Sequence, residues 1–233
     1  MKRPPPDSDP RLAELLAGLQ ALALRASAQQ QHQLLAYLDL LLAWNRRINL
    51  TAVRDPQRMV ALHLLDCLAA LPAVDRRFGR AELRVLDAGS GAGLPGVVWS
   101  VMRPSWQVCC VDAVAKKAGF VRQVAVEVGL PRLRAEHARV EALAASSFDL
   151  IVSRAFTALP DFVALTAHLR AEDGCWLALK GALPDDEIAA LPPAIDVFHV
   201  EPIAVPGLNA SRCLVWMRPR TDRQSIGAAP QLQ

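Results

Sequence analysis

The chain has 233 residues, of which 52% are apolar and 21% are charged, and its formal net charge is +3. These proportions are those of a globular protein and exclude a chain that is disordered throughout. The start MKRPPPDSDP has no apolar segment of the secretory type, and the most apolar stretch, residues 34–44, is far shorter than the ~20 residues of a membrane span. We therefore expect a soluble, cytoplasmic protein with no membrane attachment.

The N-terminal part of the chain is predicted to be helical. Residues 1–10 contain four prolines and are expected to form a disordered tail. Leucines then recur at helical spacing, which predicts helices over residues 11–25 and 28–47 and a third over 56–70 that ends before Pro72. Residues 11–80 are therefore expected to form an N-terminal helical region that caps the rest of the protein.

The pattern changes after residue 80. Strand-like runs at 83–88, 107–112, 133–137, 148–153 and 175–180 alternate with helical stretches at 95–102, 115–128 and 159–169. Strands that alternate with helices predict a parallel sheet covered on both faces. The last two strand-like segments, 197–205 and 212–218, are joined by a turn and predict an antiparallel edge. Residues 81–220 are thus expected to form one α/β domain around a mostly parallel seven-stranded sheet, followed by a flexible tail at 221–233.

A glycine-rich loop follows the first predicted strand, in the stretch Arg84-Val-Leu-Asp-Ala-Gly-Ser-Gly-Ala-Gly-Leu-Pro-Gly96. Glycines at 89, 91 and 93 permit positive φ and let a ligand approach the backbone closely. Asp112 stands at the end of the second strand, where a carboxylate suits the two ribose hydroxyls of an adenosine ligand. The loop is therefore predicted to bind a nucleotide-like cofactor.

Two cofactors compete for this loop. A dinucleotide needs G-x-G-x-x-G, which occurs here two residues too late after the strand and with Pro95 inside the phosphate turn. S-adenosylmethionine sites use an acidic strand end followed by G-x-G-x-G, and Asp87 with Gly89, Gly91 and Gly93 provides that directly. An acidic strand end also favours the ammonium and sulfonium groups of this donor and repels a diphosphate. We therefore predict a Rossmann-like class I SAM-dependent methyltransferase, with an NAD(P)-dependent oxidoreductase as the alternative.

The residues after the fourth strand indicate which atom is methylated. Enzymes that methylate exocyclic amines place an Asn/Asp-Pro-Pro-aromatic tetrad there, and enzymes that methylate C5 of pyrimidines need a cysteine near it; this chain has Ser153-Arg-Ala-Phe156. A ring nitrogen such as guanine N7 needs neither the tetrad nor the cysteine. We therefore expect in-line methyl transfer in which the enzyme only positions the donor and the acceptor atom. No catalytic side chain is then required, and Arg154 and Lys180, at two strand ends, are the candidate contributors. Arg154 is expected to contact the methionine carboxylate or a phosphate, and Lys180 a phosphate.

Several linked motifs resemble one known family, the bacterial small-subunit rRNA (guanine-N7) methyltransferase G, also called glucose-inhibited division protein B. The resemblance covers about residues 30–218. Its motifs are Trp44-Asn45-x-x-x-Asn49-Leu-Thr51, His63-x-x-Asp66, Val85-Leu-Asp-x-Gly-x-Gly-x-Gly-Leu-Pro-Gly96, Phe120-x-Arg-Gln123, Arg139-Val-Glu141, Ser153-Arg-Ala-Phe156 and Leu179-Lys-Gly181.

The resemblance implies methyl transfer to N7 of a guanine in the helix 18 loop of 16S rRNA. The partner would be 16S rRNA, the small ribosomal subunit or its assembly intermediates, with no obligate protein partner. A non-catalytic rRNA-binding or assembly factor of the same fold is a further alternative. Together with the glycine-loop argument, the expected donor site comprises Gly89, Gly91, Gly93, Leu94, Asp112, Val140, Glu141 and Arg154. The expected RNA contacts are Arg122, Arg139, Lys180, Asn49 and His63.

His63 and Asp66 are three residues apart and share a face of the predicted helix. As metal ligands they lack a third partner, and the five cysteines include no C-x-x-C pair, so no metal site is expected. Two interpretations stay open for the pair. They either hold the helical region against the sheet or belong to a pocket that faces the RNA.

Overall fold

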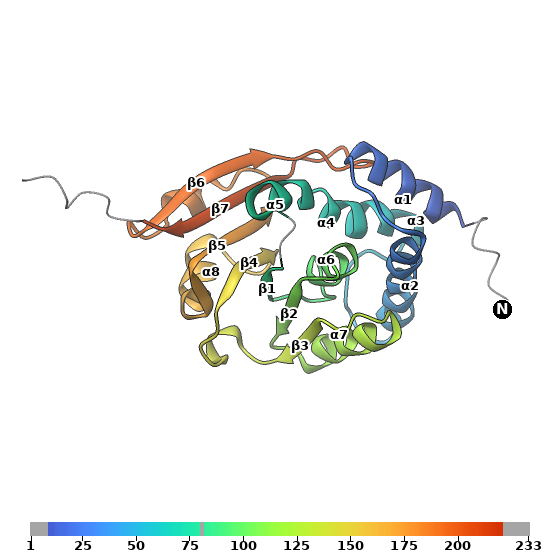
Figure 1. Ribbon diagram of the computed structural model, residues 1–233, viewed down its shortest axis with the longest axis horizontal. Coiled ribbons are helices and arrows are strands. Elements are labelled where there is room, and N and C mark those ends of the chain that lie inside the picture. Colours follow the sequence, from blue (N-terminus) through green and yellow to red (C-terminus); the bar gives the residue numbers. More distant parts are fainter. Residues whose placement is uncertain (1–8, 80–81, 221–233) are drawn as a thin grey trace, which may run out of the picture.

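We describe a computed structural model of the chain in residues 9–79 and 82–220. These residues form a seven-stranded sheet in the order β3-β2-β1-β4-β5-β7-β6, with helices on both faces (Figure 1). Its strands are β1 (Arg84–Ala88), β2 (Gln107–Asp112), β3 (Leu133–His137), β4 (Phe148–Arg154), β5 (Arg170–Lys180), β6 (Ile195–Pro202) and β7 (Cys213–Pro219).

The first five strands run parallel, and β7 pairs antiparallel with β5 and with β6. The predicted fold, a mostly parallel sheet with an antiparallel edge, is therefore confirmed. In β1, β2, β4, β5 and β7, successive apolar side chains point alternately into one or the other of two apolar cores, because side chains alternate between the two faces of a strand. Val85 of β1 packs on the face of α6 (Gly96–Met102) and α7 (Ala115–Glu127), whereas Leu86 packs on the face of α8 (Leu159–Thr166).

The helical region comprises α1 (Pro10–Ala21), α2 (Ala28–Asn45), α3 (Pro56–Met59), the π-helix η2 (Val60–Leu65), α4 (Asp66–Leu68) and α5 (Leu71–Phe78). Two predictions need correction here. Pro72 does not follow the last helix of the region but lies in the first turn of α5, where its missing N–H costs nothing. Pro10 begins α1 and so does not belong to the predicted tail; residues 1–8 and the predicted tail at 221–233 lie outside the described residues.

The segment Pro56–Phe78 has the length and the hydropathy of a membrane span, but most of its apolar part is buried inside the protein. It is a core helix. Trp99 of α6 donates its indole Nε1–H to the carbonyl oxygen of Cys67 at 2.9 Å, and Met59, Leu64 and Leu68 are fully buried. The apolar character of this segment is therefore explained by its packing against the α/β core.

The smaller elements complete the connections. The 3-10 helices η3 (Val140–Ala142) and η4 (Ala167–Leu169) precede β4 and β5, and α9 (Asp185–Ala189) follows β5. Helix α2 packs on the same side of the sheet as α6 and α7, opposite α8 (Figure 1). The carboxyl ends of β1, β2 and β4 meet at one edge of the sheet, which is the edge where ligands bind in such folds.

Candidate active site

The loop after β1 takes the backbone conformation for which glycine is needed. Gly89, Gly91 and Gly93 have φ of +64°, +58° and +84°. At Gly89 an added Cβ would lie 2.1 Å from Cδ2 of Phe156, whereas at Gly91 it would meet no atom within 4 Å. The loop is therefore closed by an aromatic ring at its first glycine and open to a ligand at its second.

Asp112 lies against this loop. Its Oδ2 accepts a hydrogen bond from Gly91 N at 2.9 Å, and its Oδ1 accepts one from Val114 N at 2.8 Å. Lys117 Nζ lies 3.9 Å from Oδ2. Each carboxylate oxygen can accept more than one hydrogen bond, so Asp112 can still accept hydrogen bonds from ribose hydroxyls. The structure thus brings Asp112 and the glycine loop together, as the predicted donor site requires.

Asp87 is fully buried behind the loop. Its Oδ2 accepts a hydrogen bond from Gly96 N at 2.8 Å at the start of α6, and within residues 9–79 and 82–220 its Oδ1 has no hydrogen-bond partner. Burial raises the pKa of Asp87 to about 7. The Asp87 side chain therefore accepts the N–H of Gly96 at the start of α6 from the buried side of the loop. Its charge does not lie on the open side of the loop.

Arg154, at the end of β4, reaches across to the helical region. Its Nη1 donates to the carbonyl oxygen of Leu62 at 3.2 Å and to Asp66 Oδ2 at 2.9 Å. Asp66 Oδ1 accepts a second bond, from Arg212 Nε at 2.6 Å. Sequence reasoning placed Arg154 at the site but did not select Arg212, because it lies 146 residues from Asp66 and no local pattern links the two.

A cavity of about 470 Å³ opens beside this ion pair, at the ends of β4 and β5 and the start of β7. Lys180 lies on its rim with its Nζ 2.7 Å from Glu187 Oε2 and 3.4 Å from the carbonyl oxygen of Thr157. The structure therefore brings Arg154 and Lys180 to one cavity. Cys213 lines it too, which the sequence analysis did not anticipate.

The other predicted donor residues follow β1 and β3. Leu94 is buried at the end of the glycine loop, Val140 is buried in η3, and Glu141 is exposed. Glu141 Oε1 accepts a bond from Arg139 Nε at 2.7 Å, and Arg139 keeps 77% of its side chain exposed. Arg122 donates its Nε–H to the carbonyl oxygen of Ala135 in β3 at 2.8 Å, so this side chain braces α7 against the sheet.

The residues of the first family motif form a hydrogen-bonded loop. Asn45 Oδ1 accepts from the backbone N–H groups of Leu50 and Thr51 at 2.9 and 3.0 Å. The Thr51 hydroxyl is 3.0 Å from His63 Nε2. His63 is 4% exposed, and its burial lowers its pKa to about 4. Asn49 stays exposed at the tip, so the loop presents Asn49 and buries His63.

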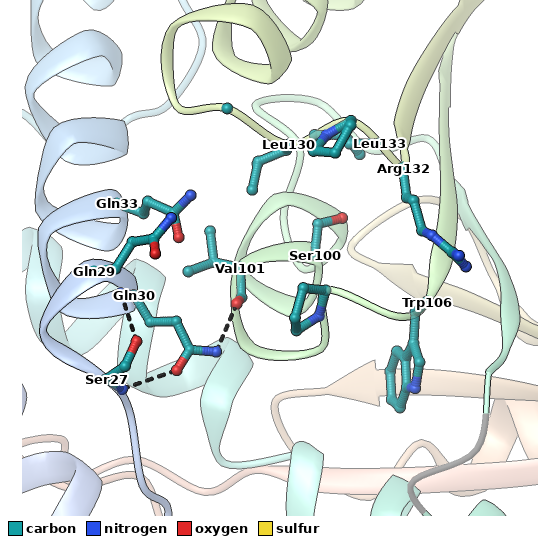
Figure 2. Close-up of a pocket in the computed structure, with 13 residues that line it drawn as sticks. Ser27, Gln29, Gln30, Gln33, Ser100, Val101, Trp106, Leu130, Arg132 and Leu133 are labelled. Carbon is teal, nitrogen blue, oxygen red and sulfur yellow. Dashed lines mark hydrogen bonds between the residues drawn. The ribbon is translucent and has the colours of Figure 1, made fainter.

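A second cavity lies between α2, α6 and the loop before β3 (Figure 2). Its volume is about 360 Å³, and none of the predicted site residues lines it. Figure 2 shows Gln30 of α2 pointing at the end of α6, where its Nε2 donates to Val101 O at 2.9 Å. Gln33 donates likewise to Val128 O at 2.8 Å. These polar contacts attach the helical region to the α/β domain away from the glycine loop.

Comparison with known proteins identifies a family. The sequence model described as rRNA small subunit methyltransferase G matches residues 30–215. Among curated proteins, ribosomal RNA small subunit methyltransferase G of Leptothrix cholodnii is 55% identical over 94% of this chain and 99% of its own length. The protein of the same name from Methylibium petroleiphilum is 56% identical over 86% of this chain and 90% of its own length.

Solved structures share the fold at low identity. A SAM-dependent methyltransferase from Leishmania major aligns with a TM-score of 0.58 and 13% identity over 78% of this chain and 83% of its own. The 1,6-didemethyltoxoflavin-N1-methyltransferase of Burkholderia thailandensis, solved with S-adenosylhomocysteine, aligns with a TM-score of 0.54 and 15% identity over 84% and 92%. The fold is thus that of class I SAM-dependent methyltransferases, and S-adenosylmethionine is the cofactor. The chain belongs to the rRNA small subunit methyltransferase G family and is an rRNA methyltransferase.

Proposed function

We propose that this enzyme transfers the methyl group of S-adenosylmethionine directly to N7 of a guanine in the helix 18 loop of 16S rRNA. The observation that carries the proposal is the placement of the glycine loop after β1 and of the cavity with Arg154 and Lys180 at the ends of β4 and β5, on the same edge of the sheet. The donor and a negatively charged substrate then approach each other at the end of β4. The substrate is 16S rRNA, free, in the small subunit or in an assembly intermediate, and the reaction takes place in the cytoplasm.

The residues at the glycine loop fit the donor. Gly91 faces open space, and Asp112 is already aimed at the loop and has spare acceptor capacity for the ribose. Val140 and Glu141 would flank the adenine, Leu94 and the loop N–H groups would hold the remainder, and Arg154 would pair with the methionine carboxylate. When bound, the donor supplies a methyl group on a sulfonium, which is transferred in line to a lone pair.

The chain's own part in this reaction is positioning. Guanine N7 has a free lone pair, so no proton has to be removed before the attack. Cys213 lies in the cavity, but burial raises the pKa of its thiol, and its Sγ lies 3.4 Å from the carbonyl oxygen of Ala182. A protonated thiol is a poor nucleophile, which supports transfer without a covalent intermediate. Arg154 would orient the donor and Lys180 the substrate by their charge.

The RNA contacts divide by exposure. Arg139 and Asn49 are exposed and available to RNA, whereas His63 is buried and would act by holding the loop of Asn49 through Thr51. Lys180 and Arg122 are each bonded within the protein, so their contacts with RNA would depend on partial release of those bonds. In this proposal residues 11–80 form the substrate-facing cap and residues 81–220 the methyltransferase domain.

The test is methylation of defined RNA by the purified enzyme. Naked 16S rRNA and small subunits, both prepared from cells that lack the gene, are incubated with S-adenosylmethionine labelled in its methyl group. We expect incorporation and, after aniline treatment, chain cleavage at one guanine of the helix 18 loop. Incorporation without cleavage would contradict N7 as the target atom. Binding of RNA without incorporation would favour the assembly-factor alternative, and tight NAD(P) binding with no affinity for S-adenosylhomocysteine would favour the oxidoreductase.

A further inference from the structure

Two arginine side chains at the substrate end of the sheet share one carboxylate. Asp66 accepts from Arg154 at 2.9 Å and from Arg212 at 2.6 Å, one bond on each oxygen. Asp66 is 5% exposed, and charges in such a setting interact more strongly than in water. Without the carboxylate, the two guanidinium groups would repel each other. Asp66 therefore holds both of them at the wall of the 470 Å³ cavity.

Both guanidinium groups keep N–H donors for a ligand. A guanidinium has five N–H donors. Within the described residues, Arg154 uses only its Nη1 group as a hydrogen-bond donor. Arg212 uses Nε toward Asp66 and Nη1 toward the carbonyl oxygen of Ser211 at 2.9 Å. Neither Nη2 has a protein partner within residues 9–79 and 82–220. The Nη2 groups of both arginines are therefore left to donate beside the cavity. Such paired N–H donors suit the oxygen atoms of a phosphate or a carboxylate.

The sheet order places this cavity beyond the donor. The predicted donor contacts follow β3 (Glu141), end β2 (Asp112) and follow β1 (Gly91), so the donor would extend across these strands toward β4. Arg212 precedes β7, which is the third strand beyond β1 in the sheet. At a spacing of about 4.8 Å between strands, the backbone of β7 lies about 14 Å from that of β1. The Arg212 side chain extends back as far as Asp66, on the far side of Arg154 from the glycine loop. We therefore assign the Arg212 side of the cavity to the substrate.

We propose that this cavity binds a backbone phosphate of the RNA beside the target nucleotide, with Arg212 as its ligand and Asp66 as the positioning residue. The inference rests on the proposed function, because it takes RNA as the substrate. The charges around the cavity are complementary to such a group. Arg154, Lys180 and Arg212 face Asp66 and Glu187, so the side chains alone carry one net positive charge. The donor carboxylate that would pair with Arg154 comes with an ammonium and a sulfonium, so the donor does not cancel this positive charge, which suits a singly charged phosphodiester.

The first experiment compares Arg212→Gln with Arg218→Gln. Arg212 directly precedes β7 and Arg218 lies near the other end of that strand. Arg218 also pairs with an aspartate, Asp196 at 3.1 Å, but it does not line the cavity, so it is the matched control. Binding of 16S rRNA is measured across a series of KCl concentrations. Loss of one phosphate contact is expected to reduce the slope of log affinity against log salt by about 0.7 to 0.9. For Arg212→Gln we also expect KM for RNA to rise roughly tenfold, with S-adenosylhomocysteine affinity within about twofold of wild type.

Asp66→Asn separates positioning from a structural role. The variant removes the negative charge between the two arginines, so RNA affinity is expected to stay equal or to increase. At the same time kcat is expected to fall at least about tenfold, because the guanidinium groups of Arg154 and Arg212 lose their alignment. A residue with only a structural role would lower thermal stability, donor affinity and RNA affinity together, and that result would overturn the role given to Asp66.

Inorganic phosphate provides a test on the wild-type protein. At ionic strength matched with chloride, phosphate is expected to compete with RNA and not with S-adenosylmethionine, and Arg212→Gln is expected to lose this competition. An unchanged salt slope and RNA KM in Arg212→Gln would overturn the proposal. So would a tenfold loss of S-adenosylhomocysteine affinity with unchanged RNA binding, which would assign the cavity to the donor carboxylate. Because wild-type methylation is measured in parallel, failure of the proposed function itself is seen separately, as no transfer by the wild type.

Discussion

Tyr37 of α2 donates its hydroxyl hydrogen to the carbonyl oxygen of Ala92 in the glycine loop, and the two atoms are 2.9 Å apart. Tyr37 is fully buried and Ala92 is 4% exposed, so neither group has an alternative partner in water. The ring of Tyr37 also packs against Phe120 of α7, with 6.3 Å between the ring centroids. Through this hydrogen bond the helical region holds the glycine loop, in which we propose that the donor binds.

Tyr37→Phe is expected to weaken both the fold and the donor site. The variant leaves the Ala92 carbonyl buried without a partner, which costs about 1–3 kcal/mol in the free energy of unfolding. We also expect a several-fold weaker affinity for S-adenosylhomocysteine, because the loop loses a support. Urea unfolding and calorimetry measure the two effects. Gln33→Ala removes a cap contact away from the loop and serves as the control; equal loss of donor affinity in both variants would contradict a specific role for Tyr37.

Gly91→Ala is expected to abolish donor binding with only a modest loss of stability. Gly91 has φ of +58° and open space where a Cβ would point, so the variant pays the cost of the left-handed conformation, about 1–2 kcal/mol, without a clash. The new methyl group would occupy the side open to the ligand. Gly129→Ala has a matched backbone, with φ of +73° and open space, but lies in the turn after α7. Equal donor affinity in the two variants would show that the ligand lies elsewhere.

The sequence pattern predicts the sheet better than it predicts the helical region. Most of the strands contain a short apolar run, and the structure places every predicted strand within about five residues of its expected bounds. The start of β5 is the largest difference, at Arg170 and not at 175, because the polar run before Cys175 still pairs with β4 at Phe148. Pro72 was misread because proline is as compatible with a helix start as with a helix end.

The polar parts of the site show where sequence reasoning stops. The glycines and Asp112 are predictable, since they follow strands whose carboxyl ends must meet. The contacts of Asp66 with Arg154 and Arg212 are not, because they join three elements that only the tertiary fold brings together. The burial of His63 is likewise set by the packing of η2 and the loop of Thr51. Its position on a helix face is compatible both with packing against the sheet and with a pocket that faces the RNA.

Asp87 is expected to make the protein less stable as the pH rises. Its pKa in the folded protein, about 7, is above its ordinary value of 3.8, so between these values the folded chain keeps a proton that the unfolded chain has released. The free energy of unfolding therefore falls from about pH 4 to pH 7. Asp87→Asn keeps an acceptor for Gly96 N and removes the titrating group. We expect it to be more stable than wild type at pH 8, by more than at pH 5, in urea unfolding.

His63 titrates in the opposite sense and provides the control for that experiment. Its pKa is lowered from 6.5 to about 4, so the unfolded chain binds the additional proton and the free energy of unfolding rises between these pH values. In the wild type the two contributions oppose each other below about pH 6.5. His63→Gln is expected to steepen the loss of stability with rising pH, whereas Asp87→Asn reverses it. Parallel pH profiles for wild type and Asp87→Asn would contradict a raised pKa for Asp87.

Methylation is expected to survive the loss of Cys213. Its thiol lies in the cavity beside Lys180, but it is 6% exposed and burial raises its pKa, so it stays protonated at neutral pH. A covalent mechanism would need this thiol as a thiolate, and removing such a nucleophile would abolish the reaction. Cys213→Ala is therefore expected to keep kcat within about fivefold of wild type, since only packing is altered. Single-turnover methyl transfer with small subunits measures this, and a loss of a thousandfold or more, with unchanged donor and RNA affinity, would show that the cysteine takes part in the chemistry.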